Sequence, residues 1–273
     1  MTISDKAPGA DPLARFKEAQ REGWAHFAPL EALTTPAAAE LVRRASPRAG
    51  QRVLDVACGT GVVAVTAARL GARVSGLDLT PELLERAREN ARIANVDIEW
   101  HQGDVEQLPF PDRTFDMVLS QFGHIFAPRP EVAIAEMLRV LQPGGTIAFA
   151  TWPPELCIGR LFALTGRYLP PPPGVAPPHL WGDPNVVRER LGAAVKDLRF
   201  DRALMRVPAL SLQHHRAATE KTAGPVLKLV ELLTATDPAR LETYRREFEA
   251  TVADYFVDNI VRNDFLITRA TKI

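Results

Sequence analysis

Short apolar strands and helical segments alternate five times between residues 36 and 151, and this alternation constrains the fold more than any other feature of the chain. The segment 52–57, Arg-Val-Leu-Asp-Val-Ala, is apolar on both faces, as is typical of a strand in a parallel sheet covered by helices. The alternation therefore predicts a doubly wound α/β sheet. We expect strands at 52–57, 73–78, 98–101, 115–120 and 145–151, and helices at 36–44, 59–70, from residue 80, and at 131–140.

The pattern changes after Thr151, where eight of the 23 prolines fall within residues 153–178. The run Pro170–Pro173 excludes a helix or a central strand there, so this stretch is an insertion. We divide the chain into an N-terminal helical lid at 1–35, a core at 36–152, a proline-rich cap insertion at 153–185, a strand-six region at 186–210, a helical cap at 211–262 and a C-terminal strand at 263–273.

The charge balance is zero, with 33 basic and 33 acidic residues, which argues against a nucleic-acid partner. The two cysteines, Cys58 and Cys157, are too few for a disulfide framework or a multi-cysteine zinc site, and no metal is expected. The N-terminus lacks an apolar signal region, and no apolar run approaches the roughly 20 residues that span a bilayer. We therefore expect a cytoplasmic protein with no membrane partner.

A glycine-rich loop, Asp55-Val-Ala-Cys-Gly-Thr-Gly61, follows the first strand and leads into a helix. Its glycines let the backbone pass close to a ligand, at the sheet edge where α/β folds bind ligands. The spacing Gly59-x-Gly61-x-x-Ala64 also matches the dinucleotide pattern of NAD enzymes, so an NAD-dependent oxidoreductase is one alternative. A Walker-type phosphate loop is excluded, because no Gly-Lys-Ser/Thr follows.

Three acids end three successive strands, namely Asp55, Asp78 and Asp104. A negative charge at Asp55 would repel a pyrophosphate, but it suits the cationic amino-acid part of S-adenosylmethionine. We expect Asp78 to accept hydrogen bonds from ribose hydroxyls and Asp104 to accept one from an adenine amino group. An acid after the second strand fits both cofactors, whereas three acids favour S-adenosylmethionine.

Four segments together resemble the class I S-adenosylmethionine-dependent methyltransferases, and most closely the small-molecule branch that includes the ubiquinone and menaquinone C-methyltransferases. These segments are 53–61 (VLDVACGTG), 76–80 (GLDLT), 103–116 (GDVEQLPFPDRTFD) and 138–145 (LRVLQPGG). The resemblance implies a Rossmann-like seven-stranded sheet whose seventh strand is antiparallel, and it identifies 36–152 as the S-adenosylmethionine-binding core. The chain offers seven candidate strands, the last at 265–268.

The motif and the strand ends together assign a set of residues to the cofactor. The expected cofactor-binding residues are Asp55, Ala57, Gly59, Thr60, Gly61, Asp78, Leu79, Asp104, Val105, Ser120 and Gln121. Cys58 is small so that the loop can fold, and we do not expect it to act as a nucleophile, because methyl transfer needs none.

His124 is the candidate catalytic residue, because it lies just past the fourth strand on the side of the expected substrate cleft. A histidine there could deprotonate a phenol, an amine or an acidic carbon as it accepts the methyl group, and the alternative is a loop histidine that only packs. His214 and His215 are weaker candidates to reach the cleft. Trp24 and Phe27 either form part of a lid or pack a helix on the core.

We expect an enzyme that moves the methyl group of S-adenosylmethionine to an O, N or C atom of a hydrophobic or aromatic small molecule. Apolar side chains in the two insertions, such as Leu161, Trp181 and Phe248, predict an apolar roof over the methyl group. One alternative is the same fold acting on a macromolecule. The segment Ser120–His124 lacks the Asn/Asp-Pro-Pro-Tyr/Phe motif of the enzymes that methylate nucleic-acid amino groups. Another alternative is a cofactor-binding cyclase or decarboxylase that does not methylate.

Overall fold

The central sheet of the computed structural model, which describes residues 11–273, has the order β3-β2-β1-β4-β5-β8-β6. Strands β1 to β5 are parallel, and β8 runs antiparallel to both β5 and β6, so the predicted seven-stranded sheet with an antiparallel last strand is confirmed. A two-residue strand, β7, pairs with β8 as an addition. The strands are β1 (Arg52–Val56), β2 (Arg73–Asp78), β3 (Ile98–Gln102), β4 (Phe115–Gln121), β5 (Leu141–Thr151), β6 (Val195–Pro208), β7 (Phe256–Val257) and β8 (Ile260–Lys272).

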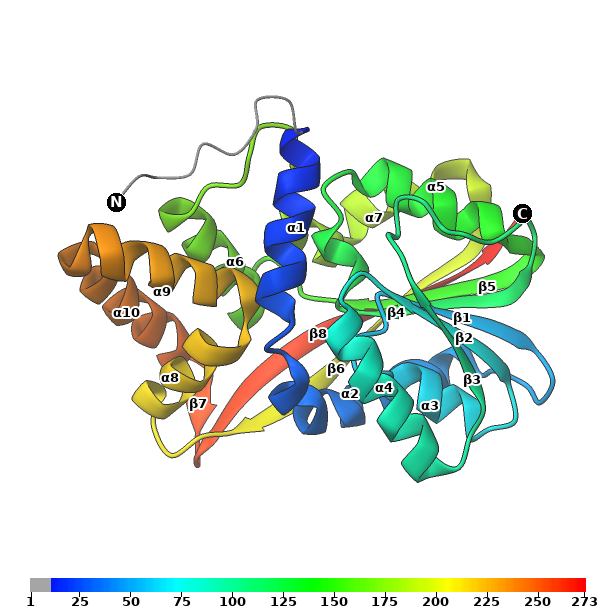
Figure 1. Cartoon of the computed structure of the whole chain (residues 1–273), viewed down its shortest axis with the longest axis horizontal. Helices are drawn as coiled ribbons and strands as arrows, with labels where there is room; N and C mark the ends of the chain where they lie inside the picture. The colour runs from blue at the N-terminus through cyan, green and yellow to red at the C-terminus, as the bar shows by residue number, and fades with distance from the viewer. Residues whose placement is uncertain (1–10) are drawn as a thin grey trace.

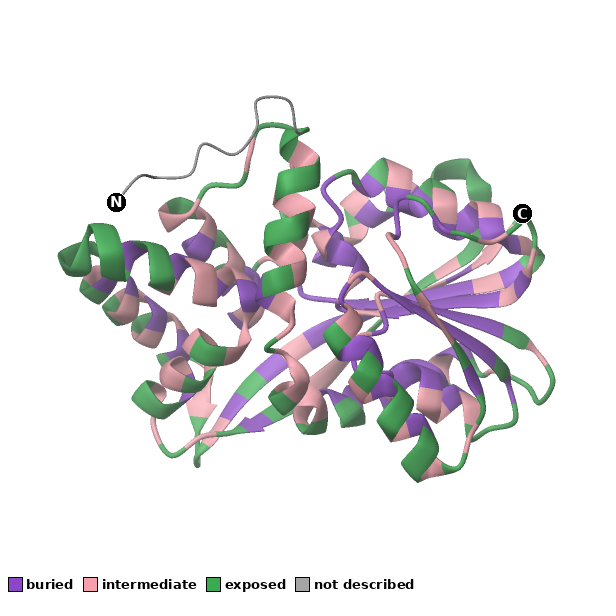
Figure 2. Cartoon of the chain, in the orientation of Figure 1, coloured by how far each residue is buried: buried purple, intermediate pink, exposed green. Residues whose placement is uncertain are grey.

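Helices cover both faces of the sheet, and the side chains between them and the strands form the core (Figures 1 and 2). One face carries α2 (Glu31–Ala45), α3 (Val62–Ala68) and α4 (Pro81–Ala94), and the other carries α5 (Pro130–Val140) and α7 (Pro184–Leu191). The helix expected at 59–70 is shorter, because residues 59–61 remain in the loop. The helix expected at residue 36 begins at Glu31, and Pro36 lies inside it.

A second group of helices lies beyond the carboxyl ends of the parallel strands, beside the N-terminal helix (Figure 1). This cap consists of α6 (Cys157–Tyr168), α8 (Leu212–Thr222), α9 (Gly224–Thr236) and α10 (Pro238–Ala253). Helix α1 (Pro12–Trp24) runs between the cap and the core, and the first ten residues of the expected lid lie outside the described residues. Short 3-10 turns are η1 (Ala28–Leu30), η2 (His124–Phe126), η3 (Pro178–Gly182) and η4 (Gly192–Ala194).

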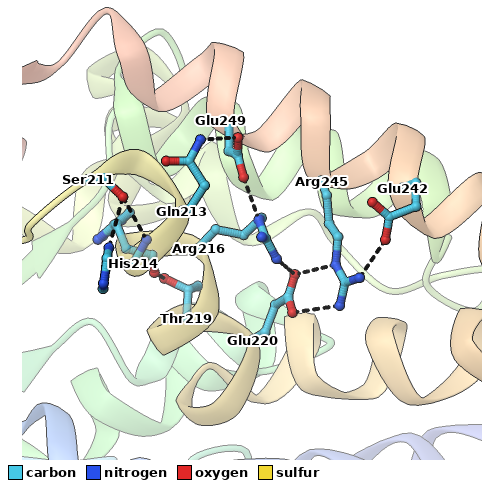
Figure 3. Close-up of polar contacts among 10 residues, drawn as sticks. Ser211, Gln213, His214, Arg216, Thr219, Glu220, Glu242, Arg245 and Glu249 are labelled. Atoms are coloured by element: carbon cyan, nitrogen blue, oxygen red, sulfur yellow. Dashed lines mark hydrogen bonds and ion pairs between the residues drawn. The ribbon is translucent and has the colours of Figure 1, made fainter.

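Ion pairs between the cap helices hold α8 against α10 (Figure 3). Arg216 on α8 binds Glu220 at 2.7 Å and Glu249 on α10 at 2.7 Å, and Arg245 on α10 binds Glu220 at 2.9 Å. Burial raises the pKa of Glu220, but the hydrogen bonds from Arg245 and Arg216 outweigh it, so the net pKa is lowered. The cap is therefore tied together by charges as well as by its buried apolar side chains.

The ribbon formed by β6 and β8 extends past the end of the parallel strands and reaches under the cap. Strand β5 ends at Thr151, which pairs with Leu266 of β8, whereas residues 260–265 of β8 pair only with β6 and β7. The ribbon thus carries side chains of both strands beyond the sheet edge, toward the cavity described next. Among residues 11–273, no helix is long and apolar enough to cross a bilayer.

Candidate active site

One cavity of about 730 Å³ lies at the carboxyl ends of the parallel strands and continues under the cap. Its core half is formed by the loop after β1, the ends of β2 and β4, the segment after β3, and α1. Its cap half is formed by α6, α8, α9, α10 and the extended β6–β8 ribbon. Representative residues of the cap half are Leu161, Phe162, Met205, Val207, Val226 and Phe248.

The loop between β1 and α3 takes a backbone shape that only small residues favour. Ala57, Gly59 and Gly61 all have positive φ angles, of 52°, 54° and 78°. A Cβ atom on Gly61 would lie 2.6 Å from the ring of Trp100, whereas a Cβ on Gly59 would meet nothing within 4 Å. Gly61 therefore fits the loop against β3, and the open space beside Gly59 belongs to the cavity wall.

Two carboxylates, Asp55 and Asp78, are buried at the base of this loop, with 1% and 7% of their surface exposed. Asp55 accepts a hydrogen bond from the Ala64 N–H at 3.0 Å, and Asp78 accepts from Gly59 N–H and Thr80 N–H, each at 2.8 Å. Burial raises the pKa of both carboxyls. Neither has an ion-pair partner among residues 11–273, so both sit beside the cavity without a protein cation.

Helix α1 closes the core half through a charged contact with the segment after β3. Lys17 donates to Asp104 at 2.5 Å and to Glu106 at 2.6 Å, and Glu106 is almost fully buried. Trp24 lines the cavity and packs its ring 4.6 Å from that of Phe126. Trp24 therefore packs on the core, as one of its two alternatives had it, and its lid role stays a prediction.

Comparisons with known proteins show which family the chain resembles. The family model described as "Methyltransferase domain" matches residues 53–145. A demethylmenaquinone methyltransferase of Deinococcus radiodurans is 35% identical over 153 residues, which are 55% of this chain and 58% of that protein. An uncharacterized protein of Mycobacterium tuberculosis is 34% identical over 257 residues, which cover 92% of this chain and 93% of the relative.

The chain belongs to the class I S-adenosylmethionine-dependent methyltransferases. The solved structure of Haemonchus contortus phosphoethanolamine N-methyltransferase 2 in complex with S-adenosyl-L-methionine shares its fold, with a TM-score of 0.57 and 17% sequence identity. That match covers 97% of this chain and 60% of the other. The resemblance seen in the sequence motifs is confirmed, and S-adenosylmethionine is the cofactor.

The buried polar groups of this methyltransferase fit that cofactor. Asp55 and Asp78 lack a protein cation, and S-adenosylmethionine brings an ammonium and a sulfonium charge together with ribose hydroxyls. Thr60 lines the cavity and is 2% exposed, but its hydroxyl also helps to lower the pKa of Glu31. The Oε1 atom of Gln121 is buried without a hydrogen-bond partner among the described residues, while its amide nitrogen donates to Thr34 O at 2.9 Å. Gln121 lines the cavity, and a bound cofactor offers its Oε1 atom a polar partner.

Most of the residues expected to bind the cofactor line the cavity, and two do not. The lining set contains Asp55, Ala57, Gly59, Thr60, Asp78, Leu79, Asp104, Val105 and Gln121. Gly61 packs against Trp100 instead. Ser120 is fully buried, and its hydroxyl donates to Val56 O at 2.7 Å, which ties β4 to β1. Gly61 and Ser120 therefore support the loop and the strands that carry the lining residues, without lining the cavity themselves.

The structure does not support the expected role of His124 as a catalytic base. Its side chain is fully buried outside the cavity lining, between the rings of Phe149 at 4.8 Å and Trp181 at 4.7 Å. Burial, helped by the charge of Arg190, lowers the pKa of His124 to about 3, and neither ring nitrogen has a hydrogen-bond partner in the described chain. The short turn η2 directs the ring into the interior, which corrects the expectation from its position after β4.

His214 and His215 do line the cavity, as the weaker expectation had it. The exposed His214 ring meets Ser211 Oγ at 2.9 Å, whereas His215 is buried against Phe248, with ring centroids 6.1 Å apart. Burial lowers the pKa of His215 to about 4, so its ring is neutral at pH 7.

Several cavity residues were not singled out from the sequence, among them Lys17, Phe122, Trp152 and Asn263. Phe122 and Trp152 stack with their ring centroids 3.9 Å apart, at the junction of the two halves. A signal for Asn263 existed, because it interrupts the apolar alternation of Val261, Phe265 and Ile267 along the last strand.

Proposed function

We propose that this enzyme transfers the methyl group of S-adenosylmethionine to an O, N or C atom of a hydrophobic or aromatic small molecule. The continuity of the cavity carries this proposal, because the core half that fits the cofactor leads directly into a cap half lined mainly by apolar side chains. In this proposal α6 and the helices of segment 211–262 act as the cap, and α1 acts as a lid. The rest of segment 153–185 does not line the cavity, and Trp181, expected in the roof, packs against His124 instead. An enclosed apolar wall favours burial of an apolar acceptor.

The bound cofactor supplies an electrophilic methyl group on a sulfonium. Loss of that methyl group leaves a neutral thioether. The chain's own residues have to bind the cofactor and the acceptor, align the acceptor atom with the methyl group and the sulfur, and keep out water. Asp55 and Asp78 place negative charge and hydrogen-bond acceptors beside the cofactor. The Phe122–Trp152 stack provides a flat apolar surface at the junction of the halves, against which an aromatic acceptor can be held.

Methyl transfer without a protein base suits an acceptor that is already nucleophilic. His215 is the titratable ring most enclosed within the cap half, and its lowered pKa makes it a weak base. We therefore propose that positioning carries more of the rate than proton abstraction does.

A pair of variants on one helix tests the proposal. Ala218 and Lys221 are both exposed positions of helix α8, but only Ala218 lines the cap half of the cavity. Purified protein is incubated with S-adenosylmethionine and a panel of phenols, amines and quinols, and formation of S-adenosylhomocysteine is measured. We expect Ala218→Trp to lose turnover while it binds S-adenosylhomocysteine normally, and Lys221→Trp to behave like the wild type.

The same assay addresses the two alternatives. Turnover with RNA, DNA or protein substrates that Ala218→Trp leaves intact would replace the small-molecule proposal by a macromolecular one. A substrate that is converted while no S-adenosylhomocysteine forms would point to a cyclase or decarboxylase that uses the same cofactor.

A further inference from the structure

Asn263 is a buried amide that the fold itself does not use. Its side chain is 2% exposed, and its Oδ1 atom has no hydrogen-bond partner among the described residues. It lines the cavity on the face of β8 that also carries Val261 and Phe265, both fully buried. Its cross-strand neighbour on β6 is Met205, which lines the same wall.

Such a group is costly to keep, because a buried polar atom without a partner loses its hydrogen bond to water and gains nothing in return. Leucine has a similar size and would satisfy the surrounding apolar face. The structure gives no packing reason for an amide at this position, so the partner of Asn263 is to be sought inside the cavity.

The position of Asn263 places it in the cap half, close to the junction with the core half. It lies three residues before Leu266, which pairs with Thr151 at the carboxyl end of β5. The Phe265 ring, on the same face of β8, lies 5.4 Å from the Phe122 ring of the aromatic stack. Asn263 is therefore on the side where an acceptor would lie against that stack.

Other polar side chains of the cap half already have partners within the protein. Thr165 meets the Tyr244 hydroxyl at 3.2 Å, Thr219 donates to His215 O at 2.9 Å, and His214 meets Ser211 Oγ at 2.9 Å. The His215 ring and the Asn259 amide are further polar groups of this wall, and a substitution at Asn263 leaves both in place. The amide can therefore be tested on its own.

Building on the proposed function, we propose that Asn263 is a specificity-determining residue that binds a hydroxyl group of the acceptor. The hydroxyl donates its hydrogen to the amide oxygen, and the amide nitrogen is able to donate back to the hydroxyl oxygen. The acceptor is then a hydrophobic molecule with a phenolic or alcoholic hydroxyl. Its hydrogen bond to Asn263 orients it in the cavity. An analogue without the hydroxyl leaves the amide unpaired, which is a strong basis for discrimination.

The test uses two probes of similar size, 2-naphthol and 2-fluoronaphthalene, titrated by calorimetry into the full chain saturated with S-adenosylhomocysteine at pH 7.5. We expect the wild type to bind 2-naphthol at least about tenfold more tightly, the ratio typical of one buried hydrogen bond. Asn263→Leu should reduce this preference to about twofold or less while its affinity for 2-fluoronaphthalene is kept or increased.

The control variant is Asn259→Gly, which removes another amide that lines the cavity, at an exposed position where φ is 60° and glycine fits. It should keep the preference for 2-naphthol. Thermal unfolding of Asn263→Leu should occur at or above the wild-type temperature, whereas a structural role for the amide would lower it.

Two results would overturn the inference: a wild type without preference for 2-naphthol, or an Asn263→Leu variant that retains it. Both leave the proposed function standing, because S-adenosylhomocysteine and the two naphthalene probes still bind. A wild type that fails to bind S-adenosylhomocysteine refutes the proposed function and the inference that rests on it.

Discussion

Replacement of His124 by leucine should make the protein more resistant to acid. Burial lowers the pKa of His124 to about 3, from an ordinary value of 6.5 that applies in the unfolded chain. Below pH 6.5 the His124 ring therefore binds a proton in the unfolded state but not in the folded state. As a result, the free energy of unfolding falls as the pH falls. Between pH 7.5 and 5.0 this linkage costs the wild type about 2 kcal/mol, and the leucine variant escapes it.

At pH 7.5 the two proteins should have similar stability. Both ring nitrogens of His124 lack hydrogen-bond partners among the described residues, so their removal costs no hydrogen bond. The variant loses ring contacts with Phe149 and Trp181, worth roughly 0.5–1.5 kcal/mol each, and it gains from removing a buried polar ring. Other titrating groups, His215 included, are common to both proteins and cancel in the difference.

The assay is urea unfolding of wild type and His124→Leu at pH 7.5 and pH 5.0, followed by tryptophan fluorescence. The difference in unfolding free energy between the two proteins should shift by about 2 kcal/mol in favour of the variant at the lower pH. Parallel losses of stability in both proteins would refute the reasoning, because they would mean that the His124 ring is protonated within the folded chain. The affinity for S-adenosylhomocysteine at pH 7.5 should be unchanged.

Three further predictions concern the core half of the cavity. Asp78→Ala should weaken binding of S-adenosylhomocysteine about tenfold or more, and unchanged calorimetric affinity of a folded variant would remove Asp78 from the site. S-adenosylmethionine should bind with a Kd on the order of micromolar while NAD gives no measurable heat, because Asp55 repels a pyrophosphate; comparable affinities would contradict this assignment. Lys17→Ala should speed amide hydrogen exchange in residues 12–24 roughly tenfold, with residues 52–56 unaffected, and equal protection in both proteins would show that the Lys17 contacts do not hold α1.

The strands and the cofactor loop could be predicted from the sequence because each is encoded locally. The apolar run at 52–57 and the glycines that follow it specify a strand and a turn without help from distant residues. The acids Asp55 and Asp78 lie at strand ends for the same reason, and both line the cavity.

Features that depend on distant segments could not be predicted in this way. No local sequence pattern indicates that Lys17 contacts Asp104, which lies 87 residues further along the chain. This contact holds α1 against the core half. The direction of His124 depends on Trp181, which comes from beyond the proline-rich stretch and encloses the ring from one side. Sequence position placed His124 at the right strand end, but the neighbours that decide its chemistry are supplied by tertiary packing.

The extension of the β6–β8 ribbon past Thr151 has a consequence for how such an enzyme diversifies. The core half is built by residues up to Pro128, and the cap half largely by residues after Thr151, so the two halves come from separate stretches of the sequence. Grafting the region 153–263 from a relative onto this core should exchange one acceptor for another while the cofactor is bound as before. Recombination at the end of β5 would then change the acceptor and leave the cofactor-binding half as it is.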